Sequence, residues 1–183
     1  MDPVNVVLPL EAVQTAMLAA VRILAFMTVA PPFSQKVVPA TVRWMVAFGL
    51  ALAVSPRLES AGTDTTAGFV GSLILQAVIG ALFGFLVMMV FSAIQSAGTF
   101  IDLFGGFQMA SAFDPMSQSS GAQFQRLYQM TAMVLLFVTD GYQIVLAGVV
   151  RTFDALPLGA ALNPDLFMSS LSNGLSQMFV GAL

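Results

Sequence analysis

The longest apolar run in this sequence covers residues 67–101 and contains no proline. It exceeds the roughly 20 apolar residues that one membrane-spanning helix needs. A second long apolar run covers residues 12–30 and stops at Pro31 and Pro32. Runs of this length must be buried in lipid or against other apolar protein. They therefore predict an all-α, membrane-associated protein.

The scarcity of charged residues supports the same fold class. Of the 183 residues, 58% are hydrophobic and only 8% are charged, whereas soluble domains carry about 25% charged residues. So few charges cannot cover the surface of a globular protein of this size. Most of the outer surface is therefore expected to face membrane lipid or apolar partner proteins.

Three further apolar runs complete the expected architecture, at residues 44–55, 127–150 and 165–183. Prolines and polar loops separate the runs, as is typical where one helix ends and the next begins. We therefore predict a single domain over residues 1–183 with about five helices. Because Leu183 falls inside the last apolar run, we expect it to be a truncation point of a longer chain.

The residue types present exclude several classes of function. The sequence has no cysteine and no histidine, which removes thiol nucleophiles, zinc and haem ligation and the usual general base. No serine lies in a Gly-x-Ser-x-Gly elbow. The net charge of −3 is spread along the chain without a basic stripe, so the sequence lacks the cluster of positive charge that binding to nucleic-acid phosphates needs. We expect no enzyme activity, no cofactor or metal, and no nucleic-acid partner.

Ionisable residues inside or beside the apolar runs need partners, because a charge in a membrane span costs several kcal/mol. They are Arg22, Asp102, Arg126, Asp140 and Arg151. One interpretation is an ion or proton pathway. The other interpretation is that these residues form ion pairs, which fix the register of helices or subunits. The candidate ion-pair residues are Arg22, Asp102, Arg126 and Asp140. The second is favoured because no two acids share a helix face at the spacing that a proton relay needs.

The segment from residue 100 to residue 115 combines flexibility with bulky apolar side chains. The pair Gly105-Gly106 weakens a helix by about 1 kcal/mol per glycine relative to alanine. The bulky residues beside this pair are Phe104, Phe107, Met109 and Phe113. Non-helical backbone at membrane depth needs a protein or water-filled cavity, and apolar side chains there can seal a pore by excluding water. The equal alternative is that these aromatics pack in a helix core.

Several short motifs follow one another in order along nearly the whole chain. They are Arg22 with Ala30-Pro31 and Phe33, Val38-Pro39 with Arg43, Gly80 with Gly84-Phe85, Ala97-Gly98-x-Phe100-Ile101-Asp102, Gly106-Phe107-x-Met109-Ala110 with Asp114-Pro115, and Leu156-Pro157-x-Gly159. None of these motifs is specific by itself. In this combination and order, the chain resembles the FliR/SctT export-gate family of type III secretion systems.

The resemblance implies a function that composition alone does not. Members are non-enzymatic subunits of a helical export channel, built as kinked helical hairpins together with FliP-like and FliQ-like partner subunits. The resemblance implies a flagellar gate in the bacterial inner (cytoplasmic) membrane, at the flagellar basal body, through which unfolded flagellar substrates pass. A virulence-type secretion gate and a multi-pass ion or small-molecule transporter are the alternatives.

The resemblance also implies a pore plug and a longer chain. Carried over to this sequence, the plug falls on Gly105, Gly106, Phe107, Gln108, Met109, Ala110, Ser111, Ala112 and Phe113, with Phe104 at its edge. Members of the family continue with a C-terminal helical hairpin. We therefore expect residues 1–183 to be the N-terminal part of an export-gate protein without that hairpin.

Overall fold

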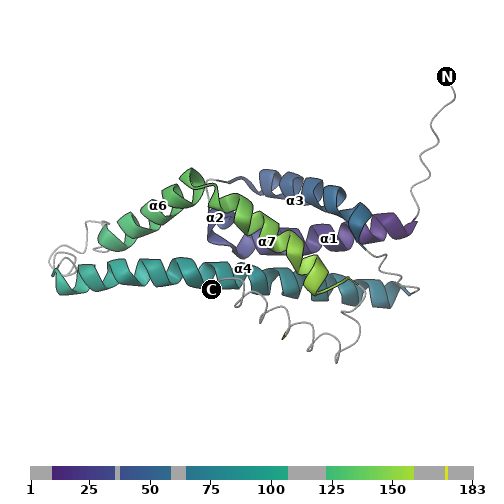
Figure 1. Cartoon of the computed structure of the whole chain (residues 1–183). Coiled ribbons are helices and arrows are strands. Elements are labelled where there is room, and N and C mark those ends of the chain that lie inside the picture. The colour runs from purple at the N-terminus through teal and green to yellow at the C-terminus, as the bar shows by residue number, and fades with distance from the viewer. Residues whose placement is uncertain (1–9, 36–37, 59–64, 107–122, 159–171, 173–183) are drawn as a thin grey trace, which may run out of the picture. The chain divides into compact units, whose positions relative to one another are not determined.

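A computed structural model describes residues 10–35, 38–58, 65–106, 123–158 and 172 of the chain. Within these ranges the regular structure is entirely helical, so the all-α fold class is confirmed. The helices are α1 (Leu10–Val29), α2 (Pro31–Ser34), α3 (Ala40–Val54), the 3-10 helix η1 (Ser55–Arg57), α4 (Thr66–Phe104), α6 (Gln123–Val138) and α7 (Gly141–Ala155) (Figure 1). The helix expected over residues 165–183 lies outside the described residues, apart from Ser172.

Two of the predicted helices match the structure closely. The apolar runs at residues 12–30 and 67–101 correspond to α1 and to α4. Pro31 and Pro32 end α1 and also occupy the first turn of α2, a position where a proline does not cost a hydrogen bond. The threonine before α4, Thr65, accepts a hydrogen bond at its hydroxyl from the amide of Gly68, at 3.2 Å. This contact caps the start of the helix.

The apolar run at residues 127–150 forms two helices rather than one. Asp140 has a φ of 55°, a left-handed backbone conformation that ends a helix and that Asp tolerates better than most residues. The amide of Asp140 bonds to the carbonyl of Phe137, which tightens the last turn of α6. The chain bends by 78° at this break. Apolar periodicity could not reveal the break because it depends on the conformation of a single residue.

The chain divides into two compact units. The first comprises Met1–Gly84 and Leu146–Leu183, and the second comprises Phe85–Val145. Both α4 and α7 run from one unit into the other.

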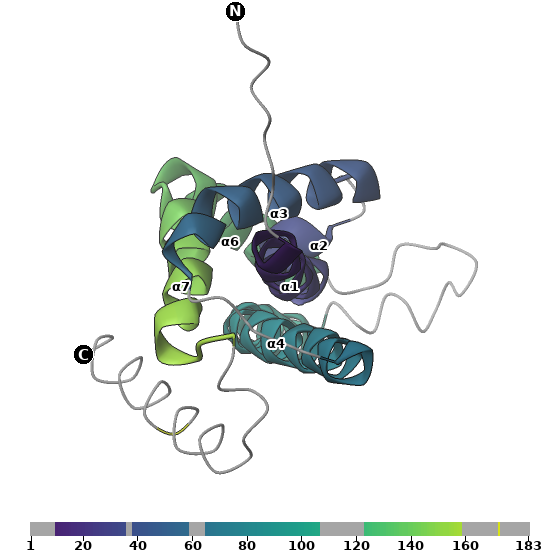
Figure 2. The same cartoon turned by 90° about the vertical axis from the view of Figure 1, so that its right-hand side faces the viewer.

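In the first unit, α1 is the central helix. Figure 2 looks along α1 and shows α3, α4 and α7 around it. Its buried side chains include Leu18, Ile23 and Phe26, none of which is more than 2% exposed. Because α1 is buried on several sides, it forms the core on which the other helices of this unit pack.

Two glycines let α4 approach α1 closely. A Cβ atom built at Gly80 would overlap the carbonyl oxygen of Arg22, and one built at Gly84 would lie 2.9 Å from the carbonyl oxygen of Phe26. Only residues without a side chain allow the two backbones this proximity. Gly80 and Gly84, which the sequence analysis named only as part of an ordered motif, therefore form the contact of α4 with α1.

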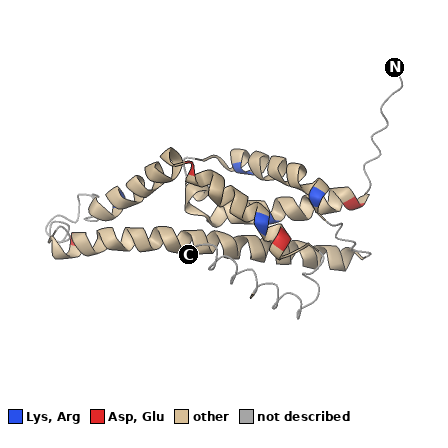
Figure 3. Cartoon of the chain, viewed as in Figure 1, with Lys and Arg blue, Asp and Glu red and all other residues tan. Residues whose placement is uncertain are grey.

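The second unit contains residues 85–104 of α4 together with α6, which lies beside them (Figure 1). Many apolar side chains here are exposed, including Val90 and Val134. Charged residues are sparse on all the described helices (Figure 3). The exposed surface of this unit is therefore mainly apolar, as the composition predicted.

Two of the described helices, α1 and α4, are long and apolar enough to cross a membrane. The bent pair α6 and α7 adds a third candidate if the two helices form one broken span. This finding rests on length and composition. It agrees with the expectation of a membrane-associated helical chain.

Candidate functional site

The most deeply buried charge in the first unit belongs to Arg22, which is 0% exposed. Its Nε donates a hydrogen bond to Oε1 of Gln76 on α4, at 2.6 Å. Its Nη1 donates to the carbonyl of Thr152 at 3.0 Å, and its Nη2 donates to the carbonyl of Leu156 at 2.9 Å. The guanidinium carbon also lies 4.3 Å from the ring centroid of Phe153.

Arg22 caps the end of α7 from a neighbouring helix. The carbonyl of Thr152 lies in the last turn of α7, which finishes at Ala155, and that of Leu156 lies one residue beyond it. The last carbonyls of a helix carry the negative end of its dipole. The carbonyl of Thr152 also accepts a hydrogen bond from the amide of Leu156, at 2.9 Å. A guanidinium offers several donors in a planar fork, so it can bond to several of these groups together. One side chain thus connects α1, α4 and α7.

Gln76 and Ser72 are polar residues on one face of α4. Both are buried and lie one helical turn apart. The amide oxygen of Gln76 accepts from Arg22, which points its Nε2 the other way. Among the described residues, neither Nε2 of Gln76 nor Oγ of Ser72 has a hydrogen-bond partner. The role of Gln76 that the contacts support is to hold the guanidinium of Arg22.

In the second unit, the buried charge is Asp102, in the last turns of α4 and 0% exposed. Its Oδ1 accepts a hydrogen bond from the backbone amide of Phe124, at 3.0 Å. Its Oδ2 accepts from the backbone amide of Gln125, also at 3.0 Å. Both amides belong to the first turn of α6, where the helix dipole is positive and backbone amides lack helical partners. Asp102 therefore caps α6 from another helix.

Gly98 lies one turn before Asp102 on α4 and allows the same contact. A Cβ atom at Gly98 would lie 2.6 Å from the Cα of Gln125 and 2.7 Å from its backbone nitrogen. Any side chain at this position would push the start of α6 away. We call Gly98, Asp102, Phe124 and Gln125 the stem, because they join the end of α4 to the beginning of α6.

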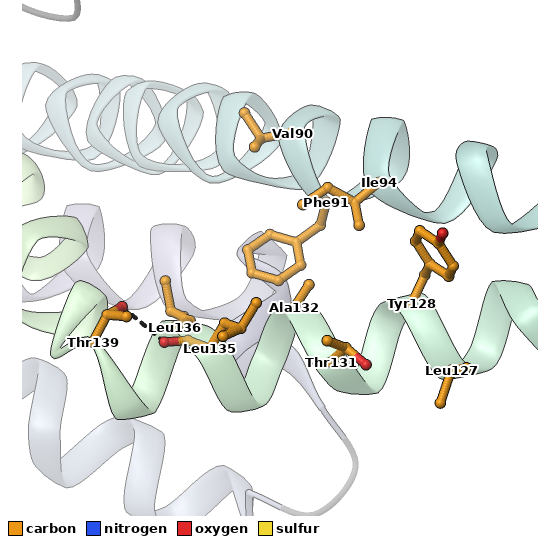
Figure 4. Close-up of a pocket in the computed structure, with 10 residues that line it drawn as sticks. All are labelled: Val90, Phe91, Ile94, Leu127, Tyr128, Thr131, Ala132, Leu135, Leu136 and Thr139. Carbon is orange, nitrogen blue, oxygen red and sulfur yellow. Dashed lines mark hydrogen bonds between the residues drawn. The ribbon is translucent and has the colours of Figure 1, made fainter.

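A groove of about 500 Å³ lies between α4 and α6 within the second unit (Figure 4). The ring of Phe91 points from α4 toward α6 in this view. The hydroxyl of Thr139, at one end, donates to the carbonyl of Leu135 at 2.7 Å. The lining residues are Val90, Phe91, Ile94, Leu127, Tyr128, Thr131, Ala132, Leu135, Leu136 and Thr139. None of them is charged, so the groove suits apolar groups.

The structure places the other predicted site residues on the surface or outside the described ranges. Arg126, Asp140 and Arg151 are exposed. Phe104 is 85% exposed, and α4 ends there, followed by Gly105 and by Gly106 with a φ of 72°. The remaining residues of the predicted plug lie outside the described residues: Phe107, Gln108, Met109, Ala110, Ser111, Ala112 and Phe113.

The described partners of the two buried charges are polar groups without formal charge. For Arg22 these are an amide oxygen and two carbonyls, and for Asp102 they are two backbone amides. The predicted ion pairs of Arg22, Asp102, Arg126 and Asp140 stay a prediction. Sequence reasoning missed Gln76, although a glutamine within the longest apolar run is a signal that could have found it.

No group of three or more His, Cys, Asp or Glu side chains within the described ranges is arranged to hold a metal ion. The arrangement therefore offers helix-capping contacts and apolar surfaces. Its chemistry is that of holding helices together at defined points. The motifs that carry the family resemblance include several of these contacts, at Arg22, Gly80, Gly98 and Asp102.

Residues 13–183 match the family of bacterial export proteins, family 1. This chain belongs to that family. The flagellar biosynthetic protein FliR of Escherichia coli (strain K12) is similar to it, with 30% identity over 164 residues that cover 88% of this chain and 62% of that protein. The FliR protein of Bacillus subtilis (strain 168) is 23% identical over 168 residues, which cover 90% of this chain and 65% of that protein.

A third relative of this bacterial export protein is the FliR protein of Pectobacterium carotovorum subsp. carotovorum. It is 31% identical over 142 residues, covering 76% of this chain and 54% of the relative. The chain thus spans less than two thirds of the length of these relatives. The family resemblance predicted from the ordered motifs is confirmed.

Proposed function

We propose that this chain is a non-enzymatic subunit of the flagellar type III protein export gate, in the bacterial inner membrane at the flagellar basal body. The observation that carries the proposal is the family match over residues 13–183, together with relatives named as flagellar biosynthetic proteins. Helices of membrane-spanning length and composition support it. The proposed substrates are unfolded flagellar proteins.

The proposed partners are FliP-like and FliQ-like subunits. The apolar surface of the described helices supports partners of this kind. Trp44 on α3 is 60% exposed and Met45 is 69% exposed. Contiguous apolar surface of this sort requires cover by lipid or by protein. In an assembled gate, we expect partner subunits to cover part of it and lipid the remainder.

The proposed plug begins where α4 ends. The rings of Phe100 and Phe104 stack with centroids 6.5 Å apart and planes inclined by 21°. The helix stops at Phe104, and Gly106 takes a left-handed conformation that glycine adopts without steric cost. This stacked aromatic pair lies in the last turns of α4, next to the point where the helix ends. It supports a plug made of Phe104, Gly105, Gly106, Phe107, Met109 and Phe113.

A conductance measurement on the assembled gate tests this proposal. Replacing Phe107 and Met109 together with alanine removes much of the apolar volume of the plug, so water and small ions should enter the resting pore. We expect membrane conductance to rise while the subunits still co-purify. The matched control replaces Phe107 and Met109 with leucine, which keeps most of the apolar volume and should leave conductance unchanged. Unchanged conductance in the Phe107→Ala, Met109→Ala variant would overturn the proposal that these residues form a plug.

The alternatives have a separate test. A transporter that uses its acidic residues should lose activity when Asp102 or Asp140 becomes asparagine. Normal export by both variants would exclude that alternative. A virulence-type gate is distinguished by the substrates that co-purify with the complex, because flagellar subunits should appear only with a flagellar gate.

A further inference from the structure

In the first unit, α3 presents a wide apolar face to the outside. On its inner side, Ala47 and Ala51 are at most 1% exposed, and α3 packs against α1. Six apolar side chains on the rest of its surface are each at least 38% exposed. We call them the outer face of α3: Val42, Trp44, Met45, Val46, Phe48 and Leu52. A contiguous apolar face of this kind needs cover by lipid or by protein.

The length and direction of α3 suit a membrane surface better than a membrane span. The helix has 15 residues, which extend over about 22 Å at the usual rise per residue. The hydrocarbon core of a bilayer is thicker, at about 30 Å. Figure 2 looks along α1 and shows α3 running across it. A helix that crosses a membrane-spanning helix can lie along the surface of the bilayer with its apolar face in the lipid.

The charges around α3 are all positive. Residues 12–58 contain four basic residues and no acidic residue. One of the four, Arg22, is buried in the core of the unit. Lys36 precedes α3 in the sequence, Arg43 lies in its first turn, and Arg57 follows it in η1. Each basic residue near an anionic lipid surface strengthens binding by roughly fivefold, so this stretch of sequence complements negatively charged headgroups.

The two described arginines beside the outer face of α3 still have donors for an acceptor outside the chain. Arg43 donates from Nη2 to the carbonyl of Val38 at 3.2 Å, and its Nε has no partner among the described residues. Arg57 is exposed. A guanidinium binds phosphate oxygens through two parallel hydrogen bonds. Trp44, next to Arg43, is the one tryptophan of the sequence, and tryptophan is enriched at the boundary between membrane and water.

We propose that α3 is a lipid-binding helix. Its outer face lies among the acyl chains at the surface of one leaflet, and Arg43 and Arg57 bind the phosphates of anionic phospholipids. A partner subunit is the competing cover for this face. Lipid is favoured because an apolar protein surface offers no negative charge to the arginines at the two ends of the face. The inference rests on the membrane location proposed above and is independent of the export role.

Photo-crosslinking in the assembled export complex tests what covers the outer face of α3. A benzophenone amino acid replaces Phe48, and the complex is reconstituted in vesicles of equal parts phosphatidylcholine and phosphatidylglycerol. Irradiation should attach phospholipid to position 48, as measured by the mass of the peptide. The same amino acid in place of Phe83, which is 9% exposed, should give no lipid adduct. At position 48, an adduct with a partner subunit, or no adduct, overturns the inference.

The composition of the lipid adducts tests the role of the arginines. In the parent complex, phosphatidylglycerol should exceed phosphatidylcholine several-fold among the adducts. Arg57→Gln should reduce this ratio by about fivefold. Arg151→Gln removes an exposed arginine of the same unit, on α7, and should leave the ratio unchanged. Equal ratios in the two variants overturn the binding of anionic headgroups beside α3.

The fluorescence of Trp44 gives a second measurement without an introduced crosslinker. Because this chain has one tryptophan, the difference in emission between the parent complex and the Trp44→Phe complex isolates its signal. Phospholipids brominated on their acyl chains quench tryptophan on contact, so most of this signal should be lost in such vesicles. An unquenched signal overturns the inference.

Flotation of the vesicles separates failure of this inference from failure of the proposed location. A complex that floats with the vesicles but gives neither lipid adducts nor quenching overturns the lipid-binding role of α3 and leaves the membrane location standing. A complex that does not float with the vesicles overturns the membrane location, and this inference with it.

Discussion

Arg22 in the first unit and Asp102 in the second unit are both buried charges that bond to backbone groups at the end of another helix, and their charges have opposite signs. Both are 0% exposed. Arg22 lies at the C-terminal end of α7, where carbonyls give a negative potential, and Asp102 lies at the N-terminal end of α6, where amides give a positive one. In a chain with few charged residues, helix ends can take the place of counterions.

The two sites differ in how many elements each connects. Arg22 bonds to α4 and to the end of α7 and contacts the ring of Phe153. Asp102 bonds only to the first turn of α6. The first site therefore holds a core together, whereas the second positions the start of one helix. Substitutions at the first site should therefore reduce stability more than those at the second.

The largest expected effect comes from Arg22→Met. The substitution leaves the amide oxygen of Gln76 and the carbonyl of Leu156 without the donors that Arg22 supplies. Each buried polar group without a partner costs about 1–3 kcal/mol, so the folded complex should lose about 3 kcal/mol. Thermal unfolding of the complex in detergent measures this loss.

Two matched variants sharpen the result for Arg22. Arg126→Met removes an exposed arginine and should change stability by less than about 0.5 kcal/mol. Arg22→Lys keeps the charge but cannot bond to all three acceptors in one plane, so it should recover only part of the loss. Full recovery by lysine would mean that charge alone matters at this site.

A smaller loss is expected from Gly80→Ala, which strains the backbone contact beside Arg22. The added Cβ atom would overlap the carbonyl oxygen of Arg22 and must force α1 and α4 apart. Overpacking of this kind costs about 1–3 kcal/mol. Gly71→Ala is the control, since its Cβ atom meets open space and alanine is the better helix former. Equal stability of the two variants would show that the close approach is absent.

The smallest effect is expected at the bend between α6 and α7. Asp140 has a positive φ, which glycine adopts freely and alanine adopts at a cost of roughly 1 kcal/mol. Asp140→Gly should therefore preserve or slightly raise stability, and Asp140→Ala should lower it. Helix content by circular dichroism during heating compares the two. A more stable alanine variant would indicate that the helix continues through residue 140.

Apolar run length predicted α1 and α4 well because each is a long helix without an internal break. The bend at Asp140 escaped prediction because one residue in a left-handed conformation leaves the apolar pattern unchanged. Gly80 and Gly84 belong to one of the ordered motifs, but the sequence did not say which helix packs against them. The contact with α1 required the three-dimensional structure.

The partners of the buried charges were harder to predict than the charges themselves. A search for partners by residue type looks for opposite charges, whereas Arg22 and Asp102 bond mainly to backbone groups. Backbone carbonyls and amides are present at every residue type except for the missing proline amide, so no sequence pattern marks them. Only the position of a helix end identifies them, and Thr152 lies 130 residues from Arg22 along the chain.

A structure of the assembled export complex that resolves side chains tests most directly whether helix ends serve as the counterions. We expect the guanidinium of Arg22 to donate to the carbonyls of Thr152 and Leu156, and the carboxylate of Asp102 to accept from the amides of Phe124 and Gln125. An Arg22 that faces a carboxylate, or an Asp102 that faces a basic side chain of a partner subunit in place of these contacts, would contradict that arrangement.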